Sequence, residues 1–254
     1  MTPVEAGAIL LAGVGAGTIN TIVGSGTLIT FPTLLAFGVP PVTANVSNTL
    51  GLVPGSVSGA WGYRRELAGQ RPRALRLGSA SVLGGLLGAV LLLALPARAF
   101  TAIVPALIGL GIALVIFQNP IQRWVAARHE HGGGLPELGA WWVWPAVLLT
   151  GVYGGYFGAA QGVLLMAVMG IGVPETLQRL NGLKNVLAAL VNAVAGLVFA
   201  LVADVDWAVV ALIAVGSVVG AQLGATVGRR LPDPVLRTVI VIVGLVALTV
   251  FLRG

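Results

Sequence analysis

The chain contains the same unusual segment twice, and this duplication limits its fold more than any other feature. The first copy reads GTINTIVGSGTLITFPTLLAFGVPPVTANVSN over 17–48, and the second reads GVYGGYFGAAQGVLLMAVMGIGVPETLQRLN over 151–181. The two copies share identical residues that are separated by the same number of positions. Gly17, Gly24, Gly38, Val39 and Pro40 of the first copy match Gly151, Gly158, Gly172, Val173 and Pro174 of the second. A further set downstream pairs Ser81, Gly84, Gly88 and Pro96 with Ser217, Gly220, Gly224 and Pro232. The chain is therefore two copies of one unit.

The composition indicates whether these copies fold in water or in a lipid bilayer. Hydrophobic residues make up 57% of the 254 residues and charged residues only 9%, too few to cover the surface of a soluble protein. The sequence therefore predicts a multi-pass membrane protein. The net charge of +6 does not indicate nucleic-acid binding, because the arginines lie in short loops between apolar runs. The chain has no cysteine, which excludes disulfides and thiolate metal sites.

Apolar runs predict the membrane segments. Eight runs are close to the ~20 residues that span a bilayer, at 4–23, 42–62, 75–95, 98–117, 140–157, 182–203, 207–228 and 234–252. Two shorter runs, 26–38 and 160–172, each follow a glycine-rich break and end at Gly-Val-Pro. Each repeat thus begins with a broken helical hairpin, and whether its short arm crosses fully or re-enters is left open. No basic segment precedes the run at 4–23, so we expect a retained helix there and no cleaved signal peptide.

The predicted fold class is an all-α polytopic membrane protein of two inverted-topology repeats. Each repeat is a broken hairpin followed by three transmembrane helices, which gives between about eight and ten membrane segments. We predict a first transmembrane repeat at 1–117, a cytoplasmic linker at 118–139 and a second transmembrane repeat at 140–254. Basic residues cluster in four places: Arg64, Arg65, Arg71, Arg73 and Arg76; Arg123 and Arg128; Arg179; and Arg229, Arg230 and Arg237. Because basic loops stay in the cytoplasm, both termini are expected outside the cell (inner/plasma) membrane, and the two hairpins open to opposite faces.

The two breaks are the strongest candidates for a binding site. Irregular backbone at membrane depth is tolerated only where it is buried in protein or lines a cavity. The tips read Gly24-Ser25-Gly26-Thr27 and Gly158-Ala159-Ala160-Gln161-Gly162. Each precedes the start of a short helix, whose free N–H groups and partial positive charge favour an anion. The glycine ladder of Gly216, Gly220, Gly224 and Gly228 indicates close helix packing instead.

The polar residues of the apolar segments favour the same kind of ligand. All eight acidic residues lie in loops or at segment ends, which argues against a cation site or a carboxylate relay. Both histidines lie in the linker, so we expect no metal site. The polar side chains left inside are Asn20, Ser25, Thr27, Asn45, Ser47, Asn48, Thr49, Tyr153, Tyr156, Gln161, Asn181, Lys184, Asn185 and Asn192. A site with hydrogen-bond donors and no acidic side chains is suited to an anion.

The basic residue Lys184 lies inside the predicted membrane run 182–203. Asn181, Lys184 and Asn185 share a helix face through their spacing of three and four, so they can converge on a ligand. Alternatively, Lys184 extends to the cytoplasmic headgroups near Arg179, and the sequence leaves both options open. Asn20 and Asn192 are expected to be interhelical hydrogen-bond partners.

Several strings resemble a known family. These are GTINTIVGSGTL, ANVSNTLGLVPGSVSGAWGYRREL, GVYGGYFGAAQG and RLNGLKN, and together they resemble the sulfite exporter TauE/SafE family, also called TSUP transporters, over nearly the whole chain. The resemblance implies a permease without a cofactor that moves small sulfur-containing anions, such as sulfite, thiosulfate or organosulfonates, often for export. It implies substrate-binding positions at Gly24, Ser25, Gly26, Asn45, Ser47, Asn48, Thr49, Gly158, Gln161, Asn181, Lys184 and Asn185. Thr27 joins these candidates as a polar residue of the first tip. The second tip has Ala159-Ala160-Gln161 where the first has Ser25-Gly26-Thr27, so the two tips offer unequal polar contacts.

Other functions remain as alternatives. An intramembrane enzyme needs a nucleophile with a base, or a metal, and the interiors of the membrane segments hold no His, Cys, Asp or Glu, so we expect no enzyme. A non-transporting scaffold subunit, or a transporter of a different small ion, stays open. The expected partners are a small anionic substrate and the lipid bilayer, with no nucleic acid. Both a monomer and a homodimer fit the sequence.

Overall fold

The fold of the chain is all-helical wherever it is described. A computed structural model describes residues 1–131, 135–226, 238, 241, 242 and 245. The helices in this part of the chain are α1 (Pro3–Ile22), α2 (Thr27–Ala36), α3 (Pro41–Gly62), α4 (Arg71–Ala94), α5 (Ala97–His131), α6 (Val143–Tyr156), α7 (Gln161–Gly172), α8 (Leu177–Val202) and α9 (Trp207–Thr226). The predicted run 234–252 and the arginines at 229, 230 and 237 fall almost entirely outside the described residues.

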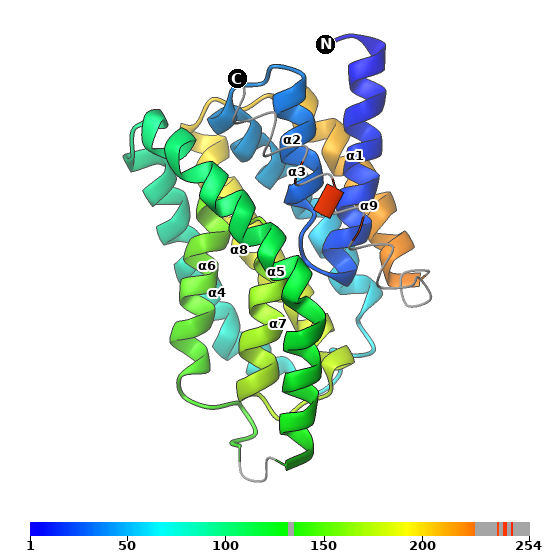
Figure 1. Cartoon of the computed structure of the whole chain (residues 1–254), viewed down its shortest axis with the longest axis vertical. Helices are drawn as coiled ribbons and strands as arrows, with labels where there is room; N and C mark the ends of the chain where they lie inside the picture. The colour runs from blue at the N-terminus through cyan, green and yellow to red at the C-terminus, as the bar shows by residue number, and fades with distance from the viewer. Residues whose placement is uncertain (132–134, 227–237, 239–240, 243–244, 246–254) are drawn as a thin grey trace.

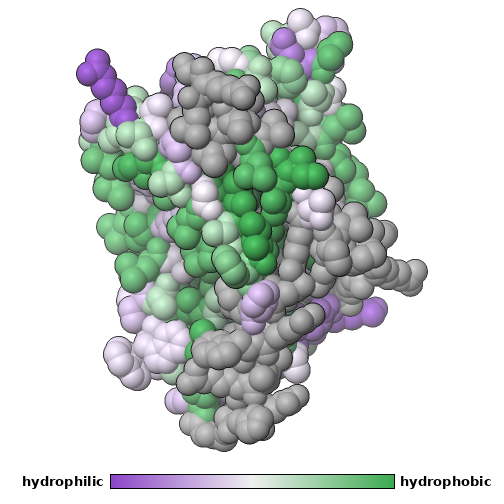
Figure 2. Space-filling view, in the orientation of Figure 1, coloured by the Kyte–Doolittle hydropathy of each residue, from purple (hydrophilic) through white to green (hydrophobic). Residues whose placement is uncertain are grey.

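The lengths and composition of these helices confirm the predicted polytopic membrane fold. Among the described residues, five segments are long and apolar enough to cross a bilayer: α1, α4, the part of α5 at Ala97–Phe117, α8 and α9. The two predicted short arms are α2, with 10 residues, and α7, with 12 residues. Leucine and valine side chains cover much of the outer surface, and Figure 2 shows this apolar surface over the middle of the molecule.

The helix α5 continues beyond the run predicted for it. The apolar run ends at 117, yet α5 extends to His131 and takes in most of the linker predicted at 118–139. That stretch is rich in Gln, Arg and Ala, which favour a helix in water as well as in lipid. Polarity therefore indicates where a helix leaves the apolar layer but not where it ends.

The two hairpins enter the molecule from opposite ends. Figure 1 shows α1 and α2 opening at the end that carries the N-terminus, and α6 and α7 opening at the other end. This is the arrangement that inverted repeats predict.

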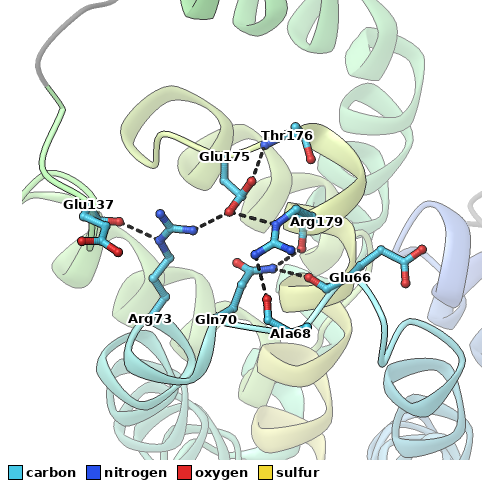
Figure 3. A network of polar contacts seen from close by, with 8 residues as sticks. All are labelled: Glu66, Ala68, Gln70, Arg73, Glu137, Glu175, Thr176 and Arg179. Carbon is cyan, nitrogen blue, oxygen red and sulfur yellow. Dashed lines mark hydrogen bonds and ion pairs between the residues drawn. The ribbon is translucent and has the colours of Figure 1, made fainter.

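The loops that carry arginine meet at one end of the molecule. In Figure 3, Arg73 at the start of α4 reaches Glu137 of the α5–α6 connection and Glu175 of the α7–α8 connection. Arg179 donates to the carbonyl oxygen of Ala68 in the α3–α4 loop at 2.9 Å. The clusters of Arg73 and Arg179 therefore have members at a common end, and the predicted cluster at 229, 230 and 237 lies outside the described residues.

Glycines set the closest helix contacts, and their positions follow the duplication. On α1 and α9, a Cβ added at Gly17 or Gly220 would overlap a backbone carbonyl of the facing helix. On α4 and α6, the same holds at Gly88 and Gly155. The predicted packing role is thus confirmed for Gly216, Gly220 and Gly224, while Gly228 is not among the described residues.

Candidate functional site

The two hairpin tips touch, backbone against backbone. The N–H of Gly162 donates to the carbonyl oxygen of Gly24 at 3.0 Å. A Cβ added to either glycine would overlap the Cα of the other, so no larger residue fits at this contact. Gly24 also has a φ of 91°, a conformation that glycine adopts without strain. The tips are buried in protein, as irregular backbone at membrane depth requires.

The helices that follow the tips direct their N-termini toward this contact. At about 1.5 Å per residue, α2 is about 15 Å long and α7 about 18 Å, and together they match the ~30 Å of a bilayer core. Since α2 runs to one end of the molecule and α7 to the other, the tips lie near mid-depth. The N–H groups of Gly26 and Thr27 have no acceptor among the described residues. Two helix N-termini therefore place partial positive charge at one spot.

The second tip is built differently from the first, as its sequence predicts. Ala160 lies in the left-handed region with a φ of 60°, which costs a non-glycine residue roughly 1–2 kcal/mol. Gly158, with a φ of 78°, takes the other left-handed position of the turn. The hydroxyl of Tyr153 donates to the carbonyl oxygen of Ala159 and so supports the turn from α6.

Two buried donors at the tips have no hydrogen-bond partner in the described part of the chain. Ser25 is 0% exposed, and its hydroxyl is unpaired. Gln161 is 4% exposed, and its Nε2 is unpaired. The Gln161 amide lies against Gly154 of α6, where a Cβ would overlap it. An unpaired buried donor costs about 1–3 kcal/mol, so each of these groups favours a ligand that accepts a hydrogen bond.

Asn48 fastens the first short helix to α3. Its Nδ2 donates to Thr27 Oγ1 at 3.2 Å, and its Oδ1 accepts from the hydroxyl of Thr30. Both ends of the Asn48 amide are therefore satisfied within the protein. Thr27 and Asn48, both predicted site residues, hold the start of α2 in place.

The other predicted residues of α3 lie in different surroundings. Asn45 Nδ2 donates to the carbonyl oxygen of Tyr156 at 2.9 Å, and its Oδ1 is unpaired among the described residues. The Thr49 hydroxyl donates to the Asn45 carbonyl of its own helix at 2.9 Å. Ser47 accepts from the N–H of Asp206 at 2.9 Å, so it faces the start of α9. The structure thus brings Asn45 to the second hairpin but does not bring Ser47 to the tips.

Lys184 points into the protein and not toward headgroups. It is 0% exposed, and its Nζ donates to the carbonyl oxygens of Asn20 and Thr21, at 3.1 Å each. These carbonyls end α1, where the helix dipole is negative. A Cβ added at Gly162 would lie 3.0 Å from Lys184 Cδ, which places the lysine stem beside the tip contact.

The three predicted residues of α8 do converge, but on backbone oxygen. Asn181 and Asn185 donate through Nδ2 to the Thr21 carbonyl at 3.4 and 3.3 Å, alongside Lys184. The acidic residues that the structure describes lie in loops or in the first or last turn of a helix, and no group of His, Cys, Asp or Glu in this part of the chain could hold a metal ion. Within the described residues, the hydrogen-bond partners of Lys184 Nζ are therefore backbone carbonyl oxygens and not carboxylates.

Two glycines of the site were not predicted as binding residues. Gly162 corresponds to Leu28 in the duplication, and Gly154 corresponds to Asn20, so the repeat gives no signal for either. Their role is evident only when the facing backbone and the Gln161 side chain are in place.

Comparison with known proteins agrees with a membrane transporter. A sequence model described as "Sulfite exporter TauE/SafE" matches residues 9–251. A probable membrane transporter protein, ORF9, from Sinorhizobium sp is 30% identical over 238 residues, covering 91% of this chain and 85% of the relative. The probable membrane transporter protein YfcA of Escherichia coli strain K12 is 28% identical over 248 residues, covering 97% and 89%. A probable membrane transporter protein of Haemophilus influenzae is 27% identical over 238 residues, covering 92% and 89%. No solved structure gives a significant match.

Proposed function

Since the chain belongs to the sulfite exporter TauE/SafE family of membrane proteins, we propose that it carries a small sulfur-containing anion across the bilayer. The substrate is sulfite, thiosulfate or an organosulfonate. The anion is held between the two hairpin tips, and the protein acts as a secondary transporter or facilitator and not as an enzyme.

One observation supports this proposal above the others. The tips meet where α2 and α7 both begin, and each tip carries a buried donor without a partner among the described residues, Ser25 in the first and Gln161 in the second. Lys184 adds a positive charge beside Gly162. A site of backbone N–H groups, neutral donors and one ammonium, with no carboxylate beside it in the described part of the chain, stabilises an oxyanion and repels a cation.

The direction that we propose is export. The arginine-rich end is assigned to the cytoplasm by the bias of basic loops, which leaves the N-terminus outside. An inside-negative potential then favours exit of an anion by about 2.3 kcal/mol per charge at 100 mV. Export driven in this way needs no carboxylate inside the membrane for coupling.

Uptake of labelled sulfite into proteoliposomes under an imposed inside-positive potential tests the proposal. We expect a saturable flux that thiosulfate and small sulfonates inhibit by competition. Lys184→Ala removes the one basic side chain that the described residues place beside the tips, so flux falls at least tenfold in a variant that still purifies as a folded protein.

A flux equal to that of empty liposomes for sulfite, thiosulfate and sulfonates alike would overturn the assignment. A scaffold subunit would give that result, and its Asn181 and Lys184 variants would change assembly or stability alone.

A further inference from the structure

We propose that the two parts that move against each other during transport are not the two sequence repeats. The first body is α1, α2 and α3 together with α9, and the second body is α4 to α8. The anion route is the boundary between them. This inference rests on the proposed function, because it describes how the site between the tips becomes accessible.

The first body is held together by close backbone packing. Gly13 and Gly17 of α1 lie against the α9 backbone at Ile213 and Ser217. On α3, a Cβ at Gly51 would meet Ile213, and one at Gly55 would meet Ser217. In addition, the Ser217 hydroxyl donates to the Gly51 carbonyl at 3.0 Å. Helix α9 belongs to the second repeat in sequence but packs against two helices of the first.

The second body is packed in the same way, but here a helix of the first repeat packs against helices of the second. Helix α4 belongs to the first repeat, yet a Cβ at Gly84 or Gly88 would overlap the α6 backbone. A Cβ at Gly85 would lie 3.1 Å from the Cα of Val191 in α8. At the arginine-rich end, Arg73 of α4 pairs with Glu175 before α8 at 2.7 Å (Figure 3).

The boundary between the bodies is different in character except at the tips, where Gly24 and Gly162 meet backbone to backbone. It runs along α3 and α8, where buried polar side chains meet. Asn192 of α8 donates across the boundary to the Ser56 hydroxyl of α3 at 3.3 Å, and Asn20 of α1, which is in the same body as Ser56, donates to that hydroxyl at 3.4 Å. The bonds of Lys184 to α1 and of Asn45 to the Tyr156 carbonyl also cross this boundary. The contact between the two hairpin tips crosses this boundary as well.

An aromatic cluster closes the boundary on the side of the short first helix. Phe31 of α2 lies with its ring centroid 5.1 Å from that of Phe157 and 6.4 Å from that of Phe100. Both of these rings belong to the second body. This contact joins side chains and not backbones, so it can separate without breaking a helix pair.

The difference between the two kinds of contact predicts which one opens. Glycine-mediated packing brings many backbone atoms into contact, and a small separation loses most of that dispersion energy. Polar side chains can replace the hydrogen bonds between them with hydrogen bonds to water or to a passing anion, at little net cost in free energy. A boundary lined by Ser56, Asn192 and Asn20 therefore serves as a route, whereas the α1–α9 and α4–α6 contacts stay closed.

The connections between the bodies fit such a motion. The chain passes from the first body to the second at 63–70 and returns at 203–206. The first connection lies at the arginine-rich end and the second at the opposite end. Two short hinges at opposite ends allow the bodies to rock about the tips.

The natural absence of cysteine permits a direct test with two matched pairs. Ser56→Cys with Asn192→Cys joins α3 to α8 across the boundary. Ser58→Cys with Gln222→Cys joins α3 to α9 inside the first body, where Gln222 donates to the Ser58 hydroxyl at 2.7 Å. Each pair is linked with a short bis-alkylating reagent, since sulfite cleaves disulfides, and each is compared with its mono-alkylated form.

We expect the Ser56–Asn192 link to reduce sulfite flux at least tenfold and the Ser58–Gln222 link to leave it within twofold. Both pairs join the first sequence repeat to the second, so loss of flux in both would mean that the sequence repeats move as units, and would overturn the proposal. Flux that survives the Ser56–Asn192 link would overturn it as well.

Hydrogen exchange at residues 25–28 gives a readout that does not depend on the substrate. If the bodies separate as proposed, only the Ser56–Asn192 link slows exchange at the first tip. This result would support the two bodies even if no sulfur anion were transported, and equal exchange in both linked proteins would contradict them.

Discussion

Single residues carry the central contact, because Gly24 and Gly162 touch through backbone atoms where no side chain fits. The first of these glycines was predicted as a site residue from the duplicated break. The second was not, since its counterpart in the other repeat is Leu28. A glycine required by a partner far away in the sequence leaves no local pattern, whereas a glycine required by a turn does.

Gly162→Ala tests this contact. The added methyl group would overlap Gly24 and press on Lys184, so we expect unfolding to become easier by about 1–3 kcal/mol and flux to be lost. Gly109→Ala in α5 is the control, because a Cβ there meets nothing within 4 Å. That variant should unfold at the same temperature or a higher one, since alanine favours a helix by about 0.5–1 kcal/mol. Thermal unfolding in detergent measures both, and equal melting temperatures for the two variants would be incompatible with the contact.

The helices themselves were largely predictable, because hydrophobic run length and glycine-rich breaks are local properties. The two short arms begin and end close to the predicted limits, at Thr27–Ala36 and Gln161–Gly172. The end of α5 was not predicted, because polar residues with good helix propensity continue a helix into solvent. The partners of Lys184 were also not predictable, since they are carbonyl groups that every residue carries.

Glu175 links two of these elements at the arginine-rich end. Burial raises the pKa of its carboxyl group, but the Thr176 N–H and the charges of Arg179 and Arg73 outweigh burial and leave that pKa below its usual value. A lowered pKa stabilises the fold above the unfolded-state value of about 4.3, and this stabilisation is lost as the pH falls through the folded-state value. The ionised form is thus the one that ties α4 to α8.

Glu175→Gln should therefore lower the free energy of unfolding by about 1–3 kcal/mol at neutral pH. The difference from the unmodified protein should shrink as the pH is lowered below about 4. Melting temperatures between neutral and acidic pH measure this trend. A difference that stays constant over that range would show that the ion pairs do not stabilise the fold.

At the scale of the whole molecule, the duplication predicts two equivalent units but not how they pack. Because the repeats match, α1 has two candidate partners of the same pattern, α4 in its own repeat and α9 in the other. The structure pairs α1 with α9 and α6 with α4. The sequences of the two repeats cannot show which helix pairs with α1, because the glycine spacing is the same for both choices. The tips lie between the two proposed bodies. The proposed binding site and the proposed anion route therefore coincide.

The most direct test of the central claim compares two buried serines. Ser25 and Ser81 are both 0% exposed, and the hydroxyls of both lack a partner among the described residues, but only Ser25 lies at a tip. Neither Ser25→Ala nor Ser81→Ala removes a hydrogen bond within the described protein, so both variants should fold. In voltage-driven sulfite uptake, we expect Ser25→Ala to lower flux about tenfold, as loss of one hydrogen bond to a charged group predicts, and Ser81→Ala to leave it unchanged. Equal flux in the two variants would contradict an anion site at the hairpin tips.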